Sequence, residues 1–200
     1  MATNLSAMSA ERLRAACAAA LAALALAASG CSNGSGSSDD SSAKGDDVSP
    51  TEQLLARPSS EQAATMYQGQ LVRVRDALKK LAPDADWDDT PPIKTGGSLC
   101  RDPFGDVDGA QVFGLFTGGG GAIPDEDWDQ AIKTTAAVLE REGYDRVHVT
   151  VNKPGLHEAS FYGEYGNVVT ISGQRSTSID LADSGCFMSA EAQAAARSGQ

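Results

Sequence analysis

The feature that most restricts the fold is a polar segment, residues 32–49, in which the only apolar side chains are Ala43 and Val48. A segment of this composition cannot bury enough apolar surface to offset the conformational entropy that it loses on ordering. We therefore expect residues 31–57 to form a disordered Ser/Gly/Asp tether, in which residues 32–49 alone have a mean reach of roughly 20 to 25 Å. The folded part is then confined to residues 58–187, and residues 188–200 are expected to form a flexible C-terminal tail.

Residues 1–30 have the layout of a secretory signal peptide. Arg12 and Arg14 provide the positive region, and an uncharged apolar stretch runs from Ala15 to Ala28. This stretch is shorter than the roughly 20 residues that a membrane-spanning helix needs. We therefore expect the leader to be removed rather than kept as a transmembrane anchor.

The leader ends in Ala28-Ser29-Gly30-Cys31, which resembles the lipobox of bacterial lipoproteins. In such proteins the cysteine is acylated, for example with palmitate, and becomes the first mature residue. The motif predicts a protein that is lipid-anchored through Cys31 to the outer face of the cytoplasmic membrane, with the lipid bilayer as its first partner. Because Ala28 stands where leucine is usual, ordinary cleavage that releases a soluble secreted protein is the alternative.

The mature chain is strongly acidic. Residues 1–30 hold one of the 27 acidic and two of the 16 basic side chains, so their removal leaves 26 and 14 and a formal net charge of −12. A surface of this charge repels nucleic acids and anionic headgroups, so we expect no nucleic-acid partner. The length of the mature chain suits one small domain.

Two cysteines remain for the folded part, because Cys17 lies in the leader and Cys31 is assigned to the lipid. Cys100 and Cys186 form an even pair in an exported, oxidising compartment, which predicts a disulfide. Free thiols or metal ligands are the alternatives, but neither cysteine has a second cysteine or histidine at ligand spacing. The bond would close a loop of more than 80 residues and stabilise the fold by roughly 4 to 5 kcal/mol.

Two segments have the periodicity of amphipathic helices. The first follows Ser59, whose spacing to Gln62 matches a capping box, and ends before Pro83. The second follows Pro124, carries three acids in its first turn and ends at Gly143. The apolar stripes that we expect to pack on the core are Tyr67, Leu71, Val74, Leu78 and Leu81, and then Trp128, Ala131, Ile132, Thr135, Val138 and Leu139.

Alternating apolar and polar residues predict the strands. One strand, at residues 111–117, precedes the second helix, and the others centre on Val149, Phe161, Ile171 and Ile179. Runs of hairpin-linked strands with few helices indicate an α+β fold. We therefore predict an antiparallel sheet of about four to five strands with two helices packed on it and one disulfide.

Several clusters have the composition of ligand sites but lack essential residues. The glycine run 118–121 is followed by acids, where a phosphate-binding loop needs a lysine. The acidic clusters at residues 84–89 and 106–109 lack the pattern of glycine and glutamate that an EF-type calcium loop requires. We therefore expect a solvated acidic turn, with no metal and no cofactor.

The sequence also lacks a convincing catalytic set. Pairing across the turn at residues 153–155 could bring His148 and His157 together, but a nucleophile would still be needed. Ser184 comes closest to a nucleophile elbow, although Ala182 and Cys186 stand where that motif needs glycines. We therefore predict that the protein is not an enzyme.

An aromatic group beside a glycine-bearing turn is the best candidate for an interaction surface. It consists of Phe161, Tyr162 and Tyr165. Exposed aromatic side chains anchor glycans and protein partners, although ordinary strand packing with one exposed face is the alternative. We predict that this surface binds an envelope protein or a glycan.

Several short motifs are spread along residues 57–187. They are Trp87 before Thr90-Pro91, Cys100 with Asp102-Pro103, Asp127-Trp128 at a helix start, and Ser184-Gly185-Cys186. Together with the long first helix, they resemble the mycobacterial LppA-type lipoproteins and their relatives in other actinobacteria. The resemblance implies a small cell-envelope domain with no established activity and no catalytic residues to carry over.

These observations predict a membrane-anchored extracytoplasmic lipoprotein that acts as a non-enzymatic envelope or interaction factor. A binding module for a small ligand or a cell-wall fragment, which uses the sheet face around Tyr162 and Tyr165, is the alternative. A pocket with convergent polar groups would favour the ligand-binding module. A flat, uncovered apolar sheet face would favour a protein partner.

Overall fold

The computed structural model describes residues 48–119 and 121–199. The predicted signal peptide, Cys31 and residues 32–47 of the tether lie outside this part of the chain. The helices are α1 (Pro50–Leu55), α2 (Ser60–Leu78), α3 (Trp128–Leu139) and α4 (Ala190–Ser198), and short 3₁₀ turns, Asp125–Asp127 and Glu140–Glu142, flank α3. The strands are β1 (Ile93–Leu99), β2 (Ala110–Gly118), β3 (Tyr144–Lys153), β4 (Leu156–Gly163), β5 (Val168–Gly173), β6 (Thr177–Asp183) and β7 (Phe187–Met188).

The strands form one antiparallel sheet in the order β1-β2-β6-β5-β4-β3, with the short β7 also paired to β2. Strands β3 to β6 follow one another through hairpin connections, whereas β2 and β6 are neighbours although they are far apart in the sequence. The centre of the sheet therefore depends on a non-local pairing, and β1 and β3 are its edge strands.

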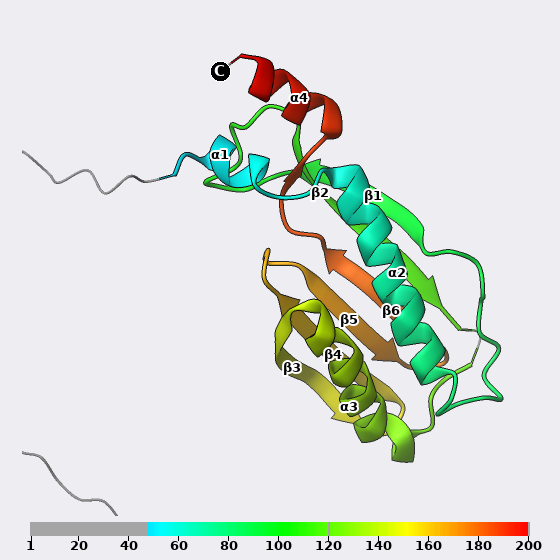
Figure 1. Ribbon diagram of the computed structural model, residues 1–200. Helices are drawn as coiled ribbons and strands as arrows, with labels where there is room; N and C mark the ends of the chain where they lie inside the picture. Colours follow the sequence, from blue (N-terminus) through cyan, green and yellow to red (C-terminus); the bar gives the residue numbers. More distant parts are fainter. Residues whose placement is uncertain (1–47, 120, 200) are drawn as a thin grey trace, which may run out of the picture. The chain divides into compact units, whose positions relative to one another are not determined.

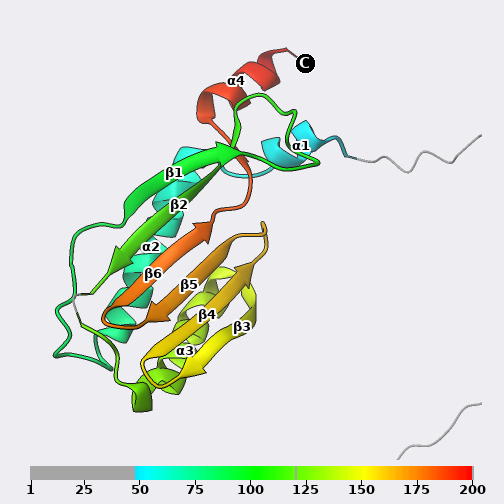
Figure 2. The same cartoon turned by 180° about the vertical axis from the view of Figure 1, so that it is seen from behind.

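Helices α2 and α3 lie side by side on one face of the sheet (Figure 1) and leave the other face uncovered (Figure 2). Alternate residues of the central strands point toward the helices and form the core. The fully buried strand residues include Leu115, Ala159, Val169, Ile171, Ile179 and Leu181. The sheet consequently has one apolar face under the helices and one face open to solvent.

The two long helices form where the apolar periodicity predicts them. In α2 the Ser59 hydroxyl accepts from the Gln62 backbone N–H, and the Gln62 side chain accepts from the Ser59 N–H, which completes a capping box. In α3 Trp128 is fully buried, and Gly143 ends the following turn in the left-handed conformation, at φ +86°. Among the described residues, no helix is both long and apolar enough to cross a membrane.

The predicted count of four to five strands and two helices is wrong, because the sheet has seven strands and the described residues form four α-helices. The missed β1 has the sequence IKTGGSL, which carries two glycines and no apolar alternation. It is a strand because its backbone pairs with β2, and all of its residues are exposed. The missed β7 has two residues and likewise exists through its pairing with β2.

Both ends of the predicted domain extend further than residues 58–187. Helix α1 lies within the predicted tether, and its Leu54 is fully buried. Helix α4 occupies the predicted flexible tail, and the buried Gln193 amide donates to the carbonyl oxygens of Leu54 and Arg57. The two terminal helices therefore hold each other in place through hydrogen bonds that sequence composition does not reveal.

Candidate binding groove

The open sheet face is polar along its centre. The strand register places Asp180, Thr170 and Ser160 in one row across β6, β5 and β4, and places Ser178, Ser172 and Glu158 in the next row. These residues alternate with the core residues, so their side chains lie on the open face, where Ser160 is buried and the other five are half-buried.

A groove of about 610 Å³ lies on this open face. Its polar lining comes from the four strands β1, β4, β5 and β6 and consists of Thr95, Ser98, Glu158, Thr170, Ser172 and Asp180. Gly114 and Ala182, which are neighbours on β2 and β6, supply the small residues of its lining. A Cβ atom at Gly114 would come within 2.6 Å of the Thr95 hydroxyl oxygen, so glycine is required for the close approach of β1.

Hydroxyl groups in the groove form a directed chain toward a carboxylate. Ser178 donates to Asp180 at 2.7 Å, and the Ser172 and Ser178 hydroxyl oxygens are 2.8 Å apart. Because the Ser178 proton is used on Asp180, Ser172 donates to Ser178. A second pair, Ser160 and Thr170, lies one row away with 3.0 Å between the hydroxyl oxygens.

The electrostatic character of the groove is acidic. Glu158 and Asp180 are its charged lining residues, and within residues 48–119 and 121–199 no basic side chain lines it. Neither carboxylate forms an ion pair within residues 48–119 and 121–199. Partial burial raises the pKa of Asp180 above its ordinary value, although the hydrogen bond from Ser178 opposes this effect. The groove can therefore accept hydrogen bonds and positive charge from a ligand.

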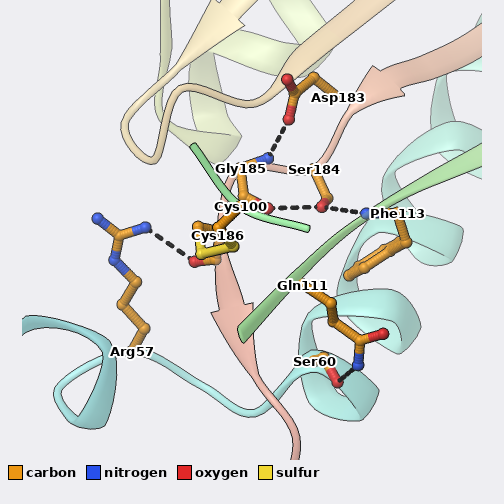
Figure 3. Close-up of a disulfide and its surroundings, with 9 residues drawn as sticks. All are labelled: Arg57, Ser60, Cys100, Gln111, Phe113, Asp183, Ser184, Gly185 and Cys186. Carbon is orange, nitrogen blue, oxygen red and sulfur yellow. Dashed lines mark hydrogen bonds between the residues drawn. A yellow bond between two sulfur atoms is a disulfide. The ribbon is translucent and has the colours of Figure 1, made fainter. Parts of the chain in front are cut away.

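The disulfide lies beyond one end of the groove and joins the segment after β1 to the segment before β7 (Figure 3). Cys100 and Cys186 are bonded, with their Cα atoms 5.7 Å apart, as the cysteine count predicts. Both cysteines are buried beside Leu54 and Met188 in a small apolar cluster separate from the main core. The bond thus fixes β1, and with it Ser98, relative to the end of the chain.

Ser184 occupies a structural position next to this disulfide (Figure 3). It is fully buried, its hydroxyl accepts from the Phe113 backbone N–H at 2.9 Å, and the same hydroxyl donates to the Gly185 carbonyl at 2.7 Å. Arg57, at the end of the predicted tether, donates to the Cys186 carbonyl and lies over the Tyr165 ring. These groups connect the N-terminal segment to the segment between β6 and β7 that carries Cys186.

The predicted aromatic surface does not exist as one surface. Phe161 is 1 % exposed and belongs to the core, because it points to the opposite side of β4 from Tyr162. Tyr162 lies on the open face, where the Arg146 guanidinium is 5.1 Å from its ring centre. Tyr165, in the turn after β4, packs edge-on against Phe187. Strand alternation and the turn therefore separate the three residues.

The two histidines also lie apart. The register puts His148 on the open face, opposite Ser160, whereas His157 is buried on the helix side and stacks on Trp128. Both ring nitrogens of His157 lie 2.7 Å from oxygen atoms, of Asp125 and Asn152.

The Asn152 amide donates to Asp129, so its oxygen faces the imidazole. With the Asp125 carboxylate at the other ring nitrogen, His157 clamps the β3–β4 turn to the start of α3. The hydrogen bonds from His157 and from the Gly155 N–H lower the pKa of Asp125.

The remaining candidates have structural roles. Lys79 donates to Asp89 at 2.6 Å, and Asp88 accepts from the Thr90 N–H, so each of these hydrogen bonds lowers the pKa of its carboxyl group. Gly119 pairs with Trp87, and a Cβ atom there would lie 3.2 Å from the indole ring. Within the described part of the chain, no group of three or more His, Cys, Asp or Glu residues could hold a metal ion.

Together these elements define a two-layer domain of helices on an antiparallel sheet, closed by one disulfide. The chain belongs to the LppA family, whose model is described as a lipoprotein confined to pathogenic Mycobacterium and matches residues 36–190. The resemblance found in the sequence motifs is thereby confirmed. No curated protein sequence matches this chain.

Two solved structures are similar to this one. The crystal structure of the lipoprotein LppA from Mycobacterium tuberculosis is 16% identical, with a TM-score of 0.59, and the match covers 72% of this chain and 86% of that chain. A DUF4853-family protein from Actinomyces odontolyticus is 14% identical, with a TM-score of 0.46, over 68% and 72% of the two chains. The first similarity shows that the fold is shared.

Proposed function

We propose that this LppA-family lipoprotein is a membrane-anchored, non-enzymatic binding module that holds a polar ligand in the groove of its open sheet face. The observation that carries the proposal is the convergence of hydroxyl and carboxylate groups from four strands on a cavity of about 610 Å³. Ligand sites combine a concave surface with a few well-placed polar groups, whereas docking surfaces for proteins are flatter and more apolar. The open face is concave and carries several polar groups, as a ligand site does.

Membrane attachment through Cys31 is supported by the lipobox motif and by membership of a lipoprotein family. Such an anchor would place the groove within a tether's reach of the outer face of the cytoplasmic membrane. Mass spectrometry of the mature N-terminus tests this step. We expect an acylated Cys31 that is lost in Cys31→Ala, and an unmodified N-terminus would contradict the anchor.

Binding rather than catalysis is supported by how the nucleophilic and basic side chains are used. The Ser184 hydroxyl is enclosed between two backbone groups, and both ring nitrogens of His157 are engaged by oxygen atoms. The groove itself offers hydroxyl groups and two separate carboxylates, which suit recognition of a polar molecule.

The experiment that tests the groove uses the full-length chain in lipid nanodiscs, incubated with a soluble digest of actinobacterial cell wall. Retained small molecules are counted by mass spectrometry. Ala182→Phe fills the groove from an exposed position, and Ala194→Phe on the exposed face of α4 is the matched control. We expect the wild type and the control to retain the same compounds and Ala182→Phe to lose them. Equal retention by all three proteins would refute binding in the groove.

A protein partner is the second candidate, and edge strand β1 favours it. The outer edge of β1 can accept another strand, and Leu99, the last residue of β1, is 81 % exposed. Cross-linking in native membranes compares the wild type with Leu99→Glu. A specific protein that is lost in the variant would support this function, and an identical cross-linking pattern would refute it.

A further inference from the structure

The two carboxylates of the groove are spaced for two different groups of one ligand. Asp180 lies on β6 and Glu158 on β4, with β5 between them. Asp180 lies opposite Thr170 and Glu158 opposite Ser172, so the two carboxylates are also two residues apart along the strand direction. From standard strand spacing, the two Cα atoms are roughly 12 Å apart. One metal ion needs several ligand oxygens within about 2.6 Å of itself, and no group of three or more His, Cys, Asp or Glu residues in the described part of the chain could hold one.

Each carboxylate can accept more hydrogen bonds than the protein supplies. Asp180 receives one side-chain hydrogen bond, from Ser178, and the described residues provide no cation for Asp180 or Glu158. A carboxylate has roughly four acceptor sites. Because no basic side chain of the described residues lines the groove, we expect the ligand to supply the positive charge that pairs with these groups.

Hydroxyl groups occupy the floor between the two carboxylates. Thr170 and Ser172 lie on β5, and each still has free hydrogen-bonding capacity after its cross-strand contact. Beside Asp180, on β2, the ring of Phe116 is 39 % exposed and offers an apolar surface. Hydroxyl groups next to an exposed ring suit a molecule with polar edges and an apolar face.

We propose that the groove recognises an amine-bearing saccharide, an oligosaccharide of two to four amino sugars. Its ammonium groups pair with Asp180 and Glu158, its hydroxyl groups engage Thr170 and Ser172, and one sugar ring lies against Phe116. This inference rests on the proposed function, since it names the ligand class of the same groove. A neutral glycan would leave both carboxylates without positive charge, and tight binding of a cationic peptide would overturn this ligand class.

Isothermal titration calorimetry of the full-length chain in nanodiscs tests the ligand class with three defined probes. They are a glucosamine tetramer, the corresponding N-acetylglucosamine tetramer, and tetralysine, each in mildly acidic buffer of low ionic strength. We expect the glucosamine tetramer to bind at least tenfold more tightly than either of the other probes. Raising the salt concentration should weaken this binding, because ion pairs at a half-open site are screened.

Isosteric variants connect the affinity to the two carboxylates. Asp180→Asn and Glu158→Gln keep the side-chain shape. Each is expected to weaken the binding affinity for the glucosamine tetramer by roughly 10- to 100-fold, the range for hydrogen bonds to charged groups. Glu126→Gln, at an exposed position on the helix side, is the matched control and should bind like the wild type. Thermal unfolding of all three variants verifies that each is folded.

The outcomes distinguish this inference from the proposed function. Equal or tighter binding of the acetylated tetramer, or tetralysine binding as tight as the glucosamine tetramer, would overturn the ligand class. No effect of either carboxylate variant would overturn it as well. If none of the probes binds while Ala182→Phe still abolishes retention of cell-wall compounds, the groove function stands and the amino-sugar assignment is wrong.

Discussion

Loss of the disulfide is expected to destabilise the domain by about 4.6 kcal/mol. Cys100 and Cys186 are 86 residues apart, and the chain-entropy relation for a loop of this length gives that value. For a domain of this size, each kcal/mol lowers the melting temperature by about 2 to 4 °C, so the total shift is roughly 9 to 18 °C. The double variant Cys100→Ala/Cys186→Ala avoids leaving a free thiol.

Urea unfolding followed by tryptophan fluorescence measures this change, since Trp87 and Trp128 are both buried in the folded domain. The wild type treated with a reductant should lose the same stability, and the double variant should not respond to the reductant. In the double variant, hydrogen exchange should rise first in α1 and α4. Leu54 of α1 belongs to the buried cluster around the disulfide, and Ala192 and Ala196 of α4 pack against that cluster. A loss below about 1 kcal/mol would refute the loop-entropy argument.

Three further predictions concern single side chains. Thr135→Val should stabilise the domain by about 1 kcal/mol in urea unfolding, because the Thr135 hydroxyl is buried without a hydrogen-bond partner among the described residues; a loss of stability would show that a partner exists. Ser184→Ala should cost about 1 to 3 kcal/mol in the same assay, because it leaves the buried Phe113 N–H unpaired, and a neutral result would contradict that role. Asp125→Asn should lower stability at neutral pH. Because folding lowers the pKa of Asp125, its carboxylate stabilises the folded domain at pH values above its pKa in the unfolded chain, and this stabilisation is lost as the pH falls through its pKa in the folded domain. The stability difference between Asp125→Asn and the wild type should therefore vanish in acid. A stability difference that does not change with pH would refute this linkage.

Local sequence signals were sufficient for the long helices and the central strands. Helix α2 has a capping box at Ser59 and an apolar stripe in its sequence, and the structure contains both. Helix α1 carries an equally clear signal, since Ser49 and Glu52 form a capping box around Pro50. The polar composition of the neighbouring segment outweighs that signal, so the predicted tether wrongly includes the residues of α1.

Other features depend on contacts that no local pattern contains. Strand β1 exists because β2 pairs with it, and β2 lies beside β6 through a non-local pairing. The groove depends on the same pairing, because it brings Gly114 and Ala182 together between rows of hydroxyl groups. Alternation predicts that residues such as Asp180 face solvent, but it cannot predict that the face is concave there.

The prediction of one aromatic surface was wrong for a related reason. Phe161 and Tyr162 are adjacent in the sequence, and adjacency in a strand places side chains on opposite faces. The alternative of strand packing with one exposed face was therefore correct for Phe161 and Tyr162. The polar residues that alternate with core residues in β4, β5 and β6 are the sequence signal for the polar open face that carries the groove.

The central claim is that a polar ligand binds in the groove of the open sheet face. The most direct measurement is a heteronuclear NMR titration of the full-length chain in nanodiscs with the cell-wall digest. We predict that the backbone amide signals of Thr170, Ser172 and Asp180 shift progressively, while those of α2 and α3 on the opposite face stay unchanged. Shifts confined to the helices or to the edge strands, with the groove residues unaffected, would contradict the claim.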